Sequence, residues 1–521
     1  MKNRTLKVAA SAASILAAVT LLSACGSNSS KKADAGNKNF TVATVRWSDW
    51  GTTFEKFPNK LAKQAGINVK WNVYLDANWT DKQSTMMAGG DLPDAFMGSI
   101  TFTDQQIAQN QADFIPLNKY INKTDMPNLT KALKENPALK AMITSPDGKI
   151  WSLPKNEPVR PTIANQLFIN KKWLDKLGLQ MPTTYVEFVK VLQAFKTQDP
   201  NGDGKADEIP YAPGNVNPTF AYILPFGNLE SDVQPNDVAL WNGKPTFVYT
   251  NDRYKAGIQA MHTAYSQGLI DPQMYTEDAT QTQANLMAKV EVVGVSAGWT
   301  ADATFGANAK DYVALPPLKG PDGKAYVFSD PDHYNENRNE FMVTTKAKNV
   351  KALMKWVDKF YTNDASIQNT YGEFGVATKK TSTGYEVLKA KSGTTADTQA
   401  WVDSLRDFGP KTWTKSNKDV TFQDSTNGDA QKLAMDAKYK KYALPAYPNV
   451  TYTNAELTTM AQLLPDINSY ATQQEAKWVT KGGLTDASYK AYVSKLNAMG
   501  LQKFMKIQTD AYNRYEKELK K

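Results

Sequence analysis

The sequence is poor in the two residue types on which most metal and nucleophile chemistry depends. Among 521 residues there are one cysteine and two histidines. The single cysteine excludes internal disulfides and thiol catalysis. Two histidines exclude a zinc site built on several imidazoles, and they leave a Ser-His-Asp triad only two positions for its base. We expect His262 to pack on a helix and His333 to lie in a polar surface loop.

Long apolar runs and a strong net charge are also missing. Beyond residue 24 there is no apolar run of roughly eighteen residues, so no later segment is expected to span a bilayer. The formal net charge is +9, and it falls to +6 without the three basic residues of the first 24. Over a chain of this length, such a charge gives no reason to expect a nucleic-acid partner. Carboxylates are plentiful, so a glycosidase with a carboxylate pair stays open.

The amino-terminal stretch predicts where the protein resides. Three basic residues precede an apolar segment from Val8 to Leu22, which is the layout of a secretory signal. The segment ends in Leu-Ser-Ala followed by Cys25, and this matches a bacterial lipobox. We predict a lipoprotein signal peptide over residues 1–24 and attachment of a diacylglycerol to the Cys25 thiol, with acyl chains such as palmitate, which would anchor the protein on the extracytoplasmic face of the cell membrane. The alternative is an ordinary signal peptide with an incidental cysteine.

The next residues are small and polar, in sharp contrast to the rest of the chain. Residues 25–39 cannot bury enough apolar surface to fold, so we expect a flexible tether. From Phe40 onward, strand and helix patterns alternate at the spacing of βαβ units, which predicts an α/β fold with a parallel sheet. The expected elements are strands at 40–47, 67–74 and 91–97 and helices at 54–64 and 79–89.

Further elements are expected along the rest of the chain. Thr184 and Glu187 form a plausible capping box for a helix that comes after them. The remaining patterns predict strands at 165–170, 290–299 and 341–344 and helices at 171–177, 250–268, 350–361, 457–477 and 486–518. Ligands of parallel sheets lie beyond the carboxyl ends of the strands. Trp47, at the end of the first strand, and Asp94, in the loop before the third, are placed for such a role.

The sharpest motif in the folded part is an acidic loop from Asp199 to Pro210. Calcium prefers six to eight hard oxygen ligands, and an EF-hand loop supplies them at alternating positions. Here they would come from Asp199, Asn201, Asp203, Lys205 (by its carbonyl), Asp207 and Glu208. Position 12 carries Pro210 where an EF-hand has a glutamate. The loop predicts structural Ca²⁺; the alternative is a solvated acidic turn.

Four separate stretches resemble one family. They are 86–94, 167–178, 199–210 and 478–515. Together they resemble the family 1 extracellular solute-binding lipoproteins, in the branch that contains the alginate-binding proteins. The resemblance implies an α/β fold of the periplasmic-binding-protein type II, with two lobes, a hinge and a cleft between them. The implied lobe 1 comprises 40–160 and 341–376, lobe 2 comprises 161–340 and 377–480, and a C-terminal helical segment covers 481–521. Crossings between the lobes are then expected near 158–164, 338–345 and 374–380.

The resemblance also implies a function. Such a protein is not an enzyme: it captures an oligosaccharide by closing its lobes, and as a monomer it delivers the sugar to the two membrane subunits and the ATPase of an ABC importer. In relatives, an acidic residue after the Leu-Pro turn and a tryptophan after the valine-rich strand line the cleft. These positions are Asp94 and Trp299 here.

Sugar recognition needs flat aromatic faces together with polar groups. Tryptophans fall at expected strand ends or loops at Trp47, Trp50, Trp151, Trp299 and Trp413. Packing within a lobe is the alternative for each of them, and helix capping is the alternative for Asp94. Two other functions stay open: a surface glycan hydrolase or lyase, and a cell-wall-binding adhesin lipoprotein.

Overall fold

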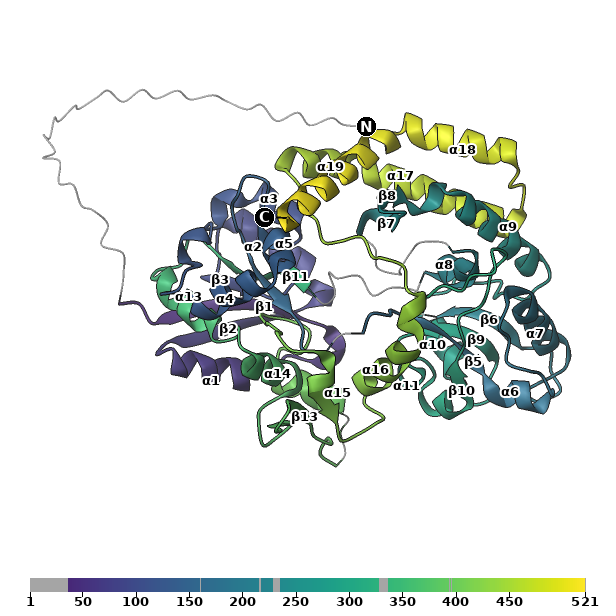
Figure 1. Cartoon of the computed structure of the whole chain (residues 1–521), viewed down its shortest axis with the longest axis horizontal. Helices are drawn as coiled ribbons and strands as arrows, with labels where there is room; N and C mark the ends of the chain where they lie inside the picture. The colour runs from purple at the N-terminus through teal and green to yellow at the C-terminus, as the bar shows by residue number, and fades with distance from the viewer. Residues whose placement is uncertain are drawn as a thin grey trace, which may run out of the picture.

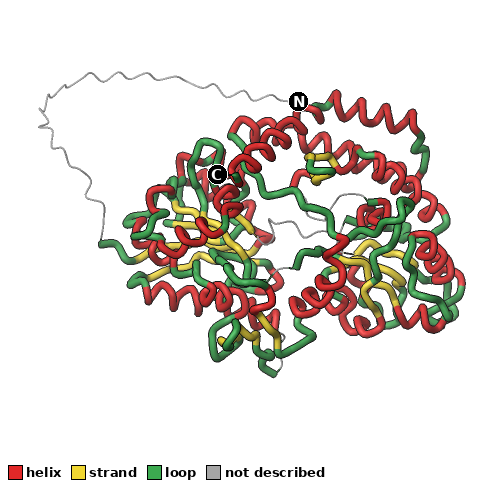
Figure 2. Tube along the Cα trace, in the orientation of Figure 1, coloured by secondary structure: helices red, strands yellow, loops and turns green. Residues whose placement is uncertain are grey.

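The structure is a computed structural model. It describes residues 36–159, 161–214, 217–227, 235–327, 336–392, 394 and 396–520. The predicted signal peptide, Cys25, most of the predicted tether and His333 lie outside these residues. Two α/β bodies, each built on its own sheet, lie side by side, and the carboxyl-terminal helices join them along one side (Figure 1). Figure 2 shows the strands gathered in the two bodies, with helices around them.

The first lobe is built on a five-stranded sheet with the order β2-β1-β3-β11-β4. The strands are β1 (Asn39–Arg46), β2 (Asn68–Leu75), β3 (Ala95–Met97), β4 (Leu153–Asn156) and β11 (Glu336–Val343). β1 pairs in parallel with β2 and β3, as the βαβ spacing predicts. β11 comes from far along the chain and pairs antiparallel to β3 and β4, so the sheet is completed only when the chain returns.

Helices cover both faces of this sheet. They are α1 (Lys56–Gln64), α2 (Trp79–Gly89), α3 (Asp104–Gln109), α4 (Pro127–Glu135), α5 (Pro137–Ile143), α13 (Val350–Asp358), α14 (Asn363–Tyr371) and α15 (Ala396–Asp403). α1 and α13 carry apolar residues at helical spacing and bury them together against the sheet. Trp356 of α13 is fully buried there, with its ring 6.0 Å from Trp71 and 6.2 Å from Phe341.

The second lobe is built on a four-stranded sheet with the order β10-β5-β9-β6. Its strands are β5 (Gln166–Asn170), β6 (Ile209–Gly214), β9 (Val293–Gly298) and β10 (Tyr312–Ala314). A hairpin, β7 (Val238–Trp241) and β8 (Lys244–Phe247), lies apart from it. The surrounding helices are α6 (Lys171–Lys176), α7 (Tyr185–Thr197), α8 (Pro218–Ile223), α9 (Asp252–Ser266), α10 (Ala279–Leu286) and α11 (Ala301–Phe305). The predicted capping box of α7 is confirmed, because Glu187 N–H donates to Thr184 Oγ1 and Thr184 N–H to Glu187 Oε2, both at 3.2 Å.

The chain passes between the lobes and, after its return, stays with the first lobe for longer than the predicted boundaries imply. The chain first crosses between β4 and β5, over 157–165, and it has returned by the start of β11 at Glu336. A small sheet of β12 (Thr378–Lys380), β13 (Tyr385–Val387) and β14 (Val420–Phe422) then packs on α14. Trp401, Leu405 and Phe408 also join the core of the first lobe, although the resemblance implied the second lobe for them. A helical pattern shows which face is buried but not which sheet buries it.

The carboxyl-terminal helices contact both lobes. They are α16 (Gly428–Tyr439), α17 (Asn454–Lys481), α18 (Asp486–Ala498) and α19 (Leu501–Leu519). The helix expected over 486–518 is divided at Gly500, which has a φ of 104°. Near its start, α17 bonds to the first lobe through Asn454 and Gln111 (3.2 Å). Farther along, its Asn468 donates to Asp237 (2.5 Å), and Pro465 lies between these contacts.

His262 lies on α9, as expected, and its Nδ1 is 2.9 Å from the Val479 carbonyl of α17. Within the described residues, no helix combines the length and the apolar character needed to cross a bilayer.

Glu475 fixes α17 in the core of the second lobe. Its side chain is 4% exposed and accepts hydrogen bonds from Thr219 Oγ1 (2.7 Å) and Tyr254 OH (3.1 Å). Burial raises the pKa of Glu475 to about 7, and Asp237 adds to the rise. The folded protein therefore holds the proton over a pH range in which the unfolded chain has already released it.

We expect Glu475 to make the protein less stable as the pH rises. Its contribution to stability is complete below the ordinary glutamate pKa and is lost as the pH rises through about 7. Wild type should therefore lose about 3 kcal/mol of unfolding free energy between about pH 5 and 8 that Glu475→Gln does not lose. Urea titrations at several pH values measure this difference. Glu135→Gln, at an exposed ion pair on α4, is the control and should follow wild type. A constant difference between Glu475→Gln and wild type would contradict the expectation.

Candidate functional site

A pocket of ≈ 880 Å³ lies where the two lobes face each other. Its first-lobe wall comes from the turn after β1 and from α15 with the segment after it. Its second-lobe wall comes from the turn after β9, and the start of α16 closes it. We call this the inter-lobe pocket; its principal side chains are Trp50, Trp299, Asp302, Trp401, Arg406, Asp407 and Asp429.

Two stacked indoles form the first-lobe wall. Trp50 lies in the short turn Ser48–Trp50 directly after β1, and Trp401 lies on α15. Their ring centroids are 5.6 Å apart and the rings are inclined by only 5°. Trp401 is 5% exposed, whereas Trp50 is half-buried. The pair therefore forms a rigid apolar platform at the carboxyl end of β1, where ligands of parallel sheets lie.

Arg46, the last residue of β1, holds this platform together. Its side chain is fully buried, and it donates to the carbonyls of Gly51 (3.0 Å), Ser404 (3.4 Å) and Trp401. The guanidinium carbon lies 5.3 Å from the Trp401 ring centroid. Burial lowers the pKa of Arg46 to about 10, so the group stays charged at neutral pH. One cation thus joins the turn that carries Trp50 to the helix that carries Trp401.

Trp299 forms the opposite wall. It comes directly after β9, and the ammonium of Lys432 lies 4.1 Å from its ring centroid, which is a cation–π contact. The same ammonium donates to the Ala164 carbonyl (2.5 Å) in the first crossing between the lobes. Asp436, one turn farther along α16, accepts the backbone N–H of Thr162 (2.6 Å). α16 therefore connects the crossing segment to the aromatic wall of the second lobe.

An ion pair at the start of α16 lies beside these rings and is bonded to the first lobe. Arg406 donates to Asp429 Oδ2 (3.0 Å), and the Tyr371 hydroxyl donates to the same oxygen (2.6 Å). The Arg406 guanidinium carbon also lies 5.0 Å from the Tyr371 ring centroid. Aromatic faces with carboxylate and guanidinium groups around them suit a solute that has an apolar face and a hydroxyl rim.

A buried charge cluster lies in the first lobe near its crossing into the second. Lys155 contacts Glu157 (2.7 Å) and Glu340 (3.8 Å), and Glu340 also accepts the Gly409 N–H (2.7 Å). Burial, with Lys155 nearby, lowers the pKa of Lys411 to about 8. Burial raises the pKa of Glu340. The contacts of Glu340 with Lys155 and with the Gly409 N–H join β4 and β11 to the segment that carries Arg406.

The structure brings only part of the predicted sugar-binding set to this pocket. Trp299 lines it, and so does Trp50, another of the tryptophans expected at a strand end or in a loop. Trp47 is 37% exposed and lies near the first-lobe wall, with its ring 5.7 Å from Phe408. Trp151 lines a different cavity.

Two predicted residues lie elsewhere for clear physical reasons. Asp94 accepts the N–H and the hydroxyl of Thr41, at 2.7 and 3.0 Å, and so fastens the amino ends of β1 and β3, opposite the pocket edge. Trp413 is 8% exposed and packs 5.6 Å from Tyr385 under the small β12–β14 sheet. Trp401, Arg406 and Asp429 were missed, because only the tertiary fold brings them to Trp50.

The acidic loop turns around its own carboxylates. Asp199 accepts the N–H groups of Gly202 (2.8 Å) and Gly204 (3.2 Å), and Asn201 donates to Asp207 (3.2 Å). Glu208 Oε1 is buried and has no hydrogen-bond partner in the part of the chain that the structure describes. Burial, with the neighbouring aspartates, raises the pKa of Glu208.

The loop also shows what a cation would have to displace. Lys205 Nζ pairs with Asp203 at 2.9 Å. No group of three or more His, Cys, Asp or Glu side chains within the described ranges is arranged to hold a metal ion. The hard oxygens and the unpartnered Glu208 fit calcium by their chemistry, and Ca²⁺ would have to replace the Lys205 contact.

A family model of the bacterial extracellular solute-binding proteins matches residues 46–367. The chain belongs to this family. The solute-binding protein is 30% identical to the fructooligosaccharide ABC transporter substrate-binding protein FusA of Streptococcus pneumoniae, over 97% of this chain and 98% of that protein.

Solved structures agree with this relationship. FusA in complex with kestose has a TM-score of 0.78 at 27% identity, covering 92% of this chain and 99% of that one. An EF-hand mutant of FusA in complex with fructo-nystose has a TM-score of 0.78 at 28% identity, again covering 92% of this chain and 99% of that one. An HMO-binding solute-binding protein of Bifidobacterium longum infantis has a TM-score of 0.77 at 26% identity, with the same coverage of 92% and 99%. The alginate-binding protein AlgQ2 has a TM-score of 0.67 at 21% identity, covering 92% of this chain and 98% of that one, and it supports the fold alone. The predicted type II fold is therefore confirmed.

We expect Arg46→Met to destabilise the solute-binding protein by about 3 kcal/mol, because it leaves buried carbonyls without donors. Urea unfolding followed by tryptophan fluorescence measures the loss, and the native emission should also shift as the Trp50–Trp401 stack loosens. Lys70→Met removes an exposed cation from β2 and is the control. Equal midpoints for Arg46→Met and Lys70→Met would show that Arg46 does not hold the platform.

Proposed function

We propose that this solute-binding protein captures an oligosaccharide in the inter-lobe pocket and delivers it, uncleaved, to an ABC importer made of two membrane subunits and an ATPase. The observation that carries the proposal is the pair of aromatic walls, Trp50–Trp401 and Trp299, on facing lobes. The fructooligosaccharide relative FusA and the HMO-binding relative support the class of solute.

Closure on the sugar would follow from differential binding. A sugar that contacts both walls favours the state in which the walls are close, because only that state provides both sets of contacts. The hinge would lie in 157–165 and in the other segments that join the lobes.

We further propose that the protein works as a monomer on the extracytoplasmic face of the cell membrane. The lipobox ending at Cys25 supports a lipid anchor, and the family description supports an extracellular place. Residues 25–39 would act as the tether that lets the folded part reach its permease.

Calcium would have a structural role in this protein. Asp199, Asn201, Asp203, Asp207 and Glu208 would ligate by side chain and Lys205 by its carbonyl. The existence of an EF-hand mutant of FusA supports such a loop in a relative. Bound Ca²⁺ would neutralise carboxylates that otherwise repel one another. It would give Glu208 the partner that it lacks among the described residues.

We expect Trp299→Ala to weaken oligosaccharide binding by about 2 kcal/mol, or roughly thirtyfold, because it removes one aromatic wall. Isothermal titration with kestose and a panel of other oligosaccharides measures the change. Trp413→Phe alters a core tryptophan away from the pocket and should bind as wild type does. Equal affinity of Trp299→Ala and wild type would remove Trp299 from the site. Chromatography after long incubation should find every sugar intact, and cleavage products would favour a hydrolase or lyase.

We expect a chelator to lower the melting temperature and Ca²⁺, but not Mg²⁺ alone, to restore it. Differential scanning calorimetry measures both effects. Glu208→Gln should reduce the response, since it removes a ligand charge, whereas Lys205→Ala should keep it, because that residue would ligate through its backbone. A melting temperature unaffected by chelation would leave the loop as an acidic turn.

A further inference from the structure

A second cavity lies on the other side of the segments that join the lobes. Figure 1 shows α3 and α17 on one side of these segments and α15 and α16 on the other. The cavity has a volume of ≈ 350 Å³ and lies between α3, the Ser145–Trp151 region, β11 and the residues that begin α17. It continues into a space of ≈ 690 Å³, which shares Asp104, Arg338, Tyr452 and Leu457 with it. We call both together the α3–α17 groove.

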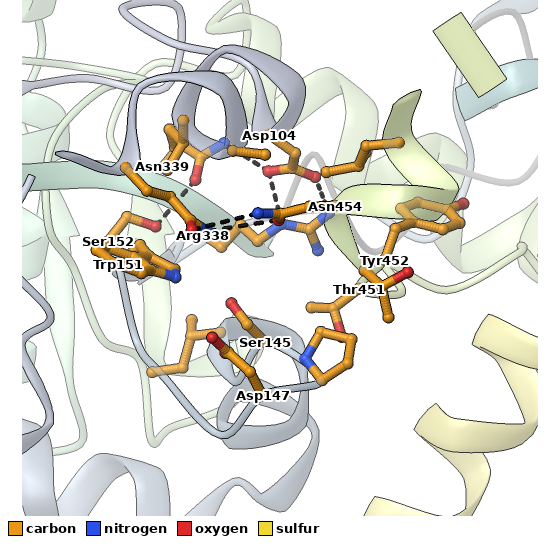
Figure 3. A pocket seen from close by; sticks show the side chains of 17 residues that line it. Asp104, Ser145, Asp147, Trp151, Ser152, Arg338, Asn339, Thr451, Tyr452 and Asn454 are labelled. Atoms are coloured by element: carbon orange, nitrogen blue, oxygen red, sulfur yellow. Dashed lines mark hydrogen bonds and ion pairs between the residues drawn. The ribbon is translucent and has the colours of Figure 1, made fainter. Parts of the chain in front are cut away.

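The groove has an aromatic donor that no described residue satisfies. Trp151 is 8% exposed, and its Nε1–H has no hydrogen-bond partner within the described residues. Figure 3 shows its nitrogen turned toward the open space, which the Ser145 hydroxyl and the Asp147 carboxylate also face. A buried N–H without an acceptor is unfavourable, so an acceptor from a bound molecule would be stabilised here.

The charges of the groove are already matched. Arg338 donates to Asp104 Oδ1 (2.9 Å) and to Asn449 Oδ1 (2.7 Å), and it makes a second contact with Asp104. Asp147 pairs with Lys149 at 3.3 Å. Arg338 is the cation in the described lining of the first cavity, and because it is already paired the lining offers no free cation to an anionic ligand.

The remaining lining combines apolar side chains with neutral polar groups beside the indole. Ser152 donates to Asn339 (2.9 Å), and Gln111 and Asn454 exchange hydrogen bonds across the wall. Hydroxyls, amides and one aromatic edge are the groups that recognise a hydroxylated, uncharged molecule. The volume of the first cavity falls in the range of roughly 300–1,000 Å³ that is typical of small-molecule sites.

We propose that the α3–α17 groove is a second binding site, for a small neutral saccharide. The indole N–H of Trp151 donates to a sugar hydroxyl, and the amides and hydroxyls around it accept and donate to the others. This site does not depend on the proposed function of the inter-lobe pocket, from which the joining segments separate it.

The walls of the groove give the second site a direct mechanical link to the lobes. One wall is α3 with β11 of the first lobe, and the other is the start of α17. Farther along, α17 is held in the second lobe by Glu475. A sugar bound here favours one spacing of α3 and α17, so its affinity depends on the angle between the lobes, and the dependence is reciprocal.

The test uses saturation-transfer NMR and titration with glucose, fructose, galactose, sucrose and maltose. Four proteins are compared: wild type, Trp299→Ala, Trp151→Phe and Trp413→Phe. Trp151→Phe keeps an aromatic ring but removes the N–H. Trp413→Phe is a matched control, because Trp413 is also 8% exposed and its Nε1 also lacks a partner among the described residues, but it lies outside the groove.

We expect at least one sugar of the panel to bind Trp299→Ala as it binds wild type. Trp151→Phe should weaken that binding by about tenfold, through loss of one buried hydrogen bond, and Trp413→Phe should leave it unchanged. Glucuronate should bind more weakly than glucose. No binding of any panel sugar to Trp299→Ala, or equal binding by Trp151→Phe and wild type, would overturn the second site. Failure of the proposed function would instead show as oligosaccharide binding that Trp299→Ala does not change.

Discussion

The inter-lobe pocket depends on a single buried cation at the end of the first strand. Arg46 has no carboxylate bonded to it among the described residues; carbonyl oxygens and aromatic rings hold its charge. Backbone carbonyls are fixed in direction, so the guanidinium can satisfy all of them only when the turn after β1 and the end of α15 are correctly placed. The bonds of Arg46 therefore fix the positions of Trp50 and Trp401 relative to each other in their stack.

α16 has the corresponding role for the second lobe. Its Lys432 and Asp436 bond to the first crossing segment, and the same lysine lies on the Trp299 ring. Asp429, near the start of the helix, pairs with Arg406 of the first lobe. A movement of the crossing segment is thus transmitted to the aromatic wall and to the ion pair together. That arrangement suits a receptor whose shape must report whether its pocket is filled.

Local features were predictable, and distant ones were not. The parallel pairing of β1 with β2, the Thr184–Glu187 capping box and the turn of the acidic loop around Asp199 each depend on residues that are close together in the sequence. Trp299 was identified from the resemblance, which implies a cleft tryptophan directly after the valine-rich strand. The partners Trp401 and Arg406 are hundreds of residues from Trp50, and nothing local marks them. Asp94 shows the converse, since a strand-edge acid can bond its neighbour Thr41 as well as a ligand.

Pro465 gives α17 a property that an uninterrupted helix would not have. Asn454, before the proline, bonds to the first lobe and Asn468, after it, bonds to the second, so the proline lies between these two bonds, although Met460 already packs in the core of the second lobe. Proline has no N–H to give to the carbonyl one turn earlier, and its ring crowds that carbonyl. Bending stiffness is therefore lowest at this point. A rotation of one lobe against the other would be taken up as flexure of one helical turn, while the packed contacts at both ends of the helix stay intact.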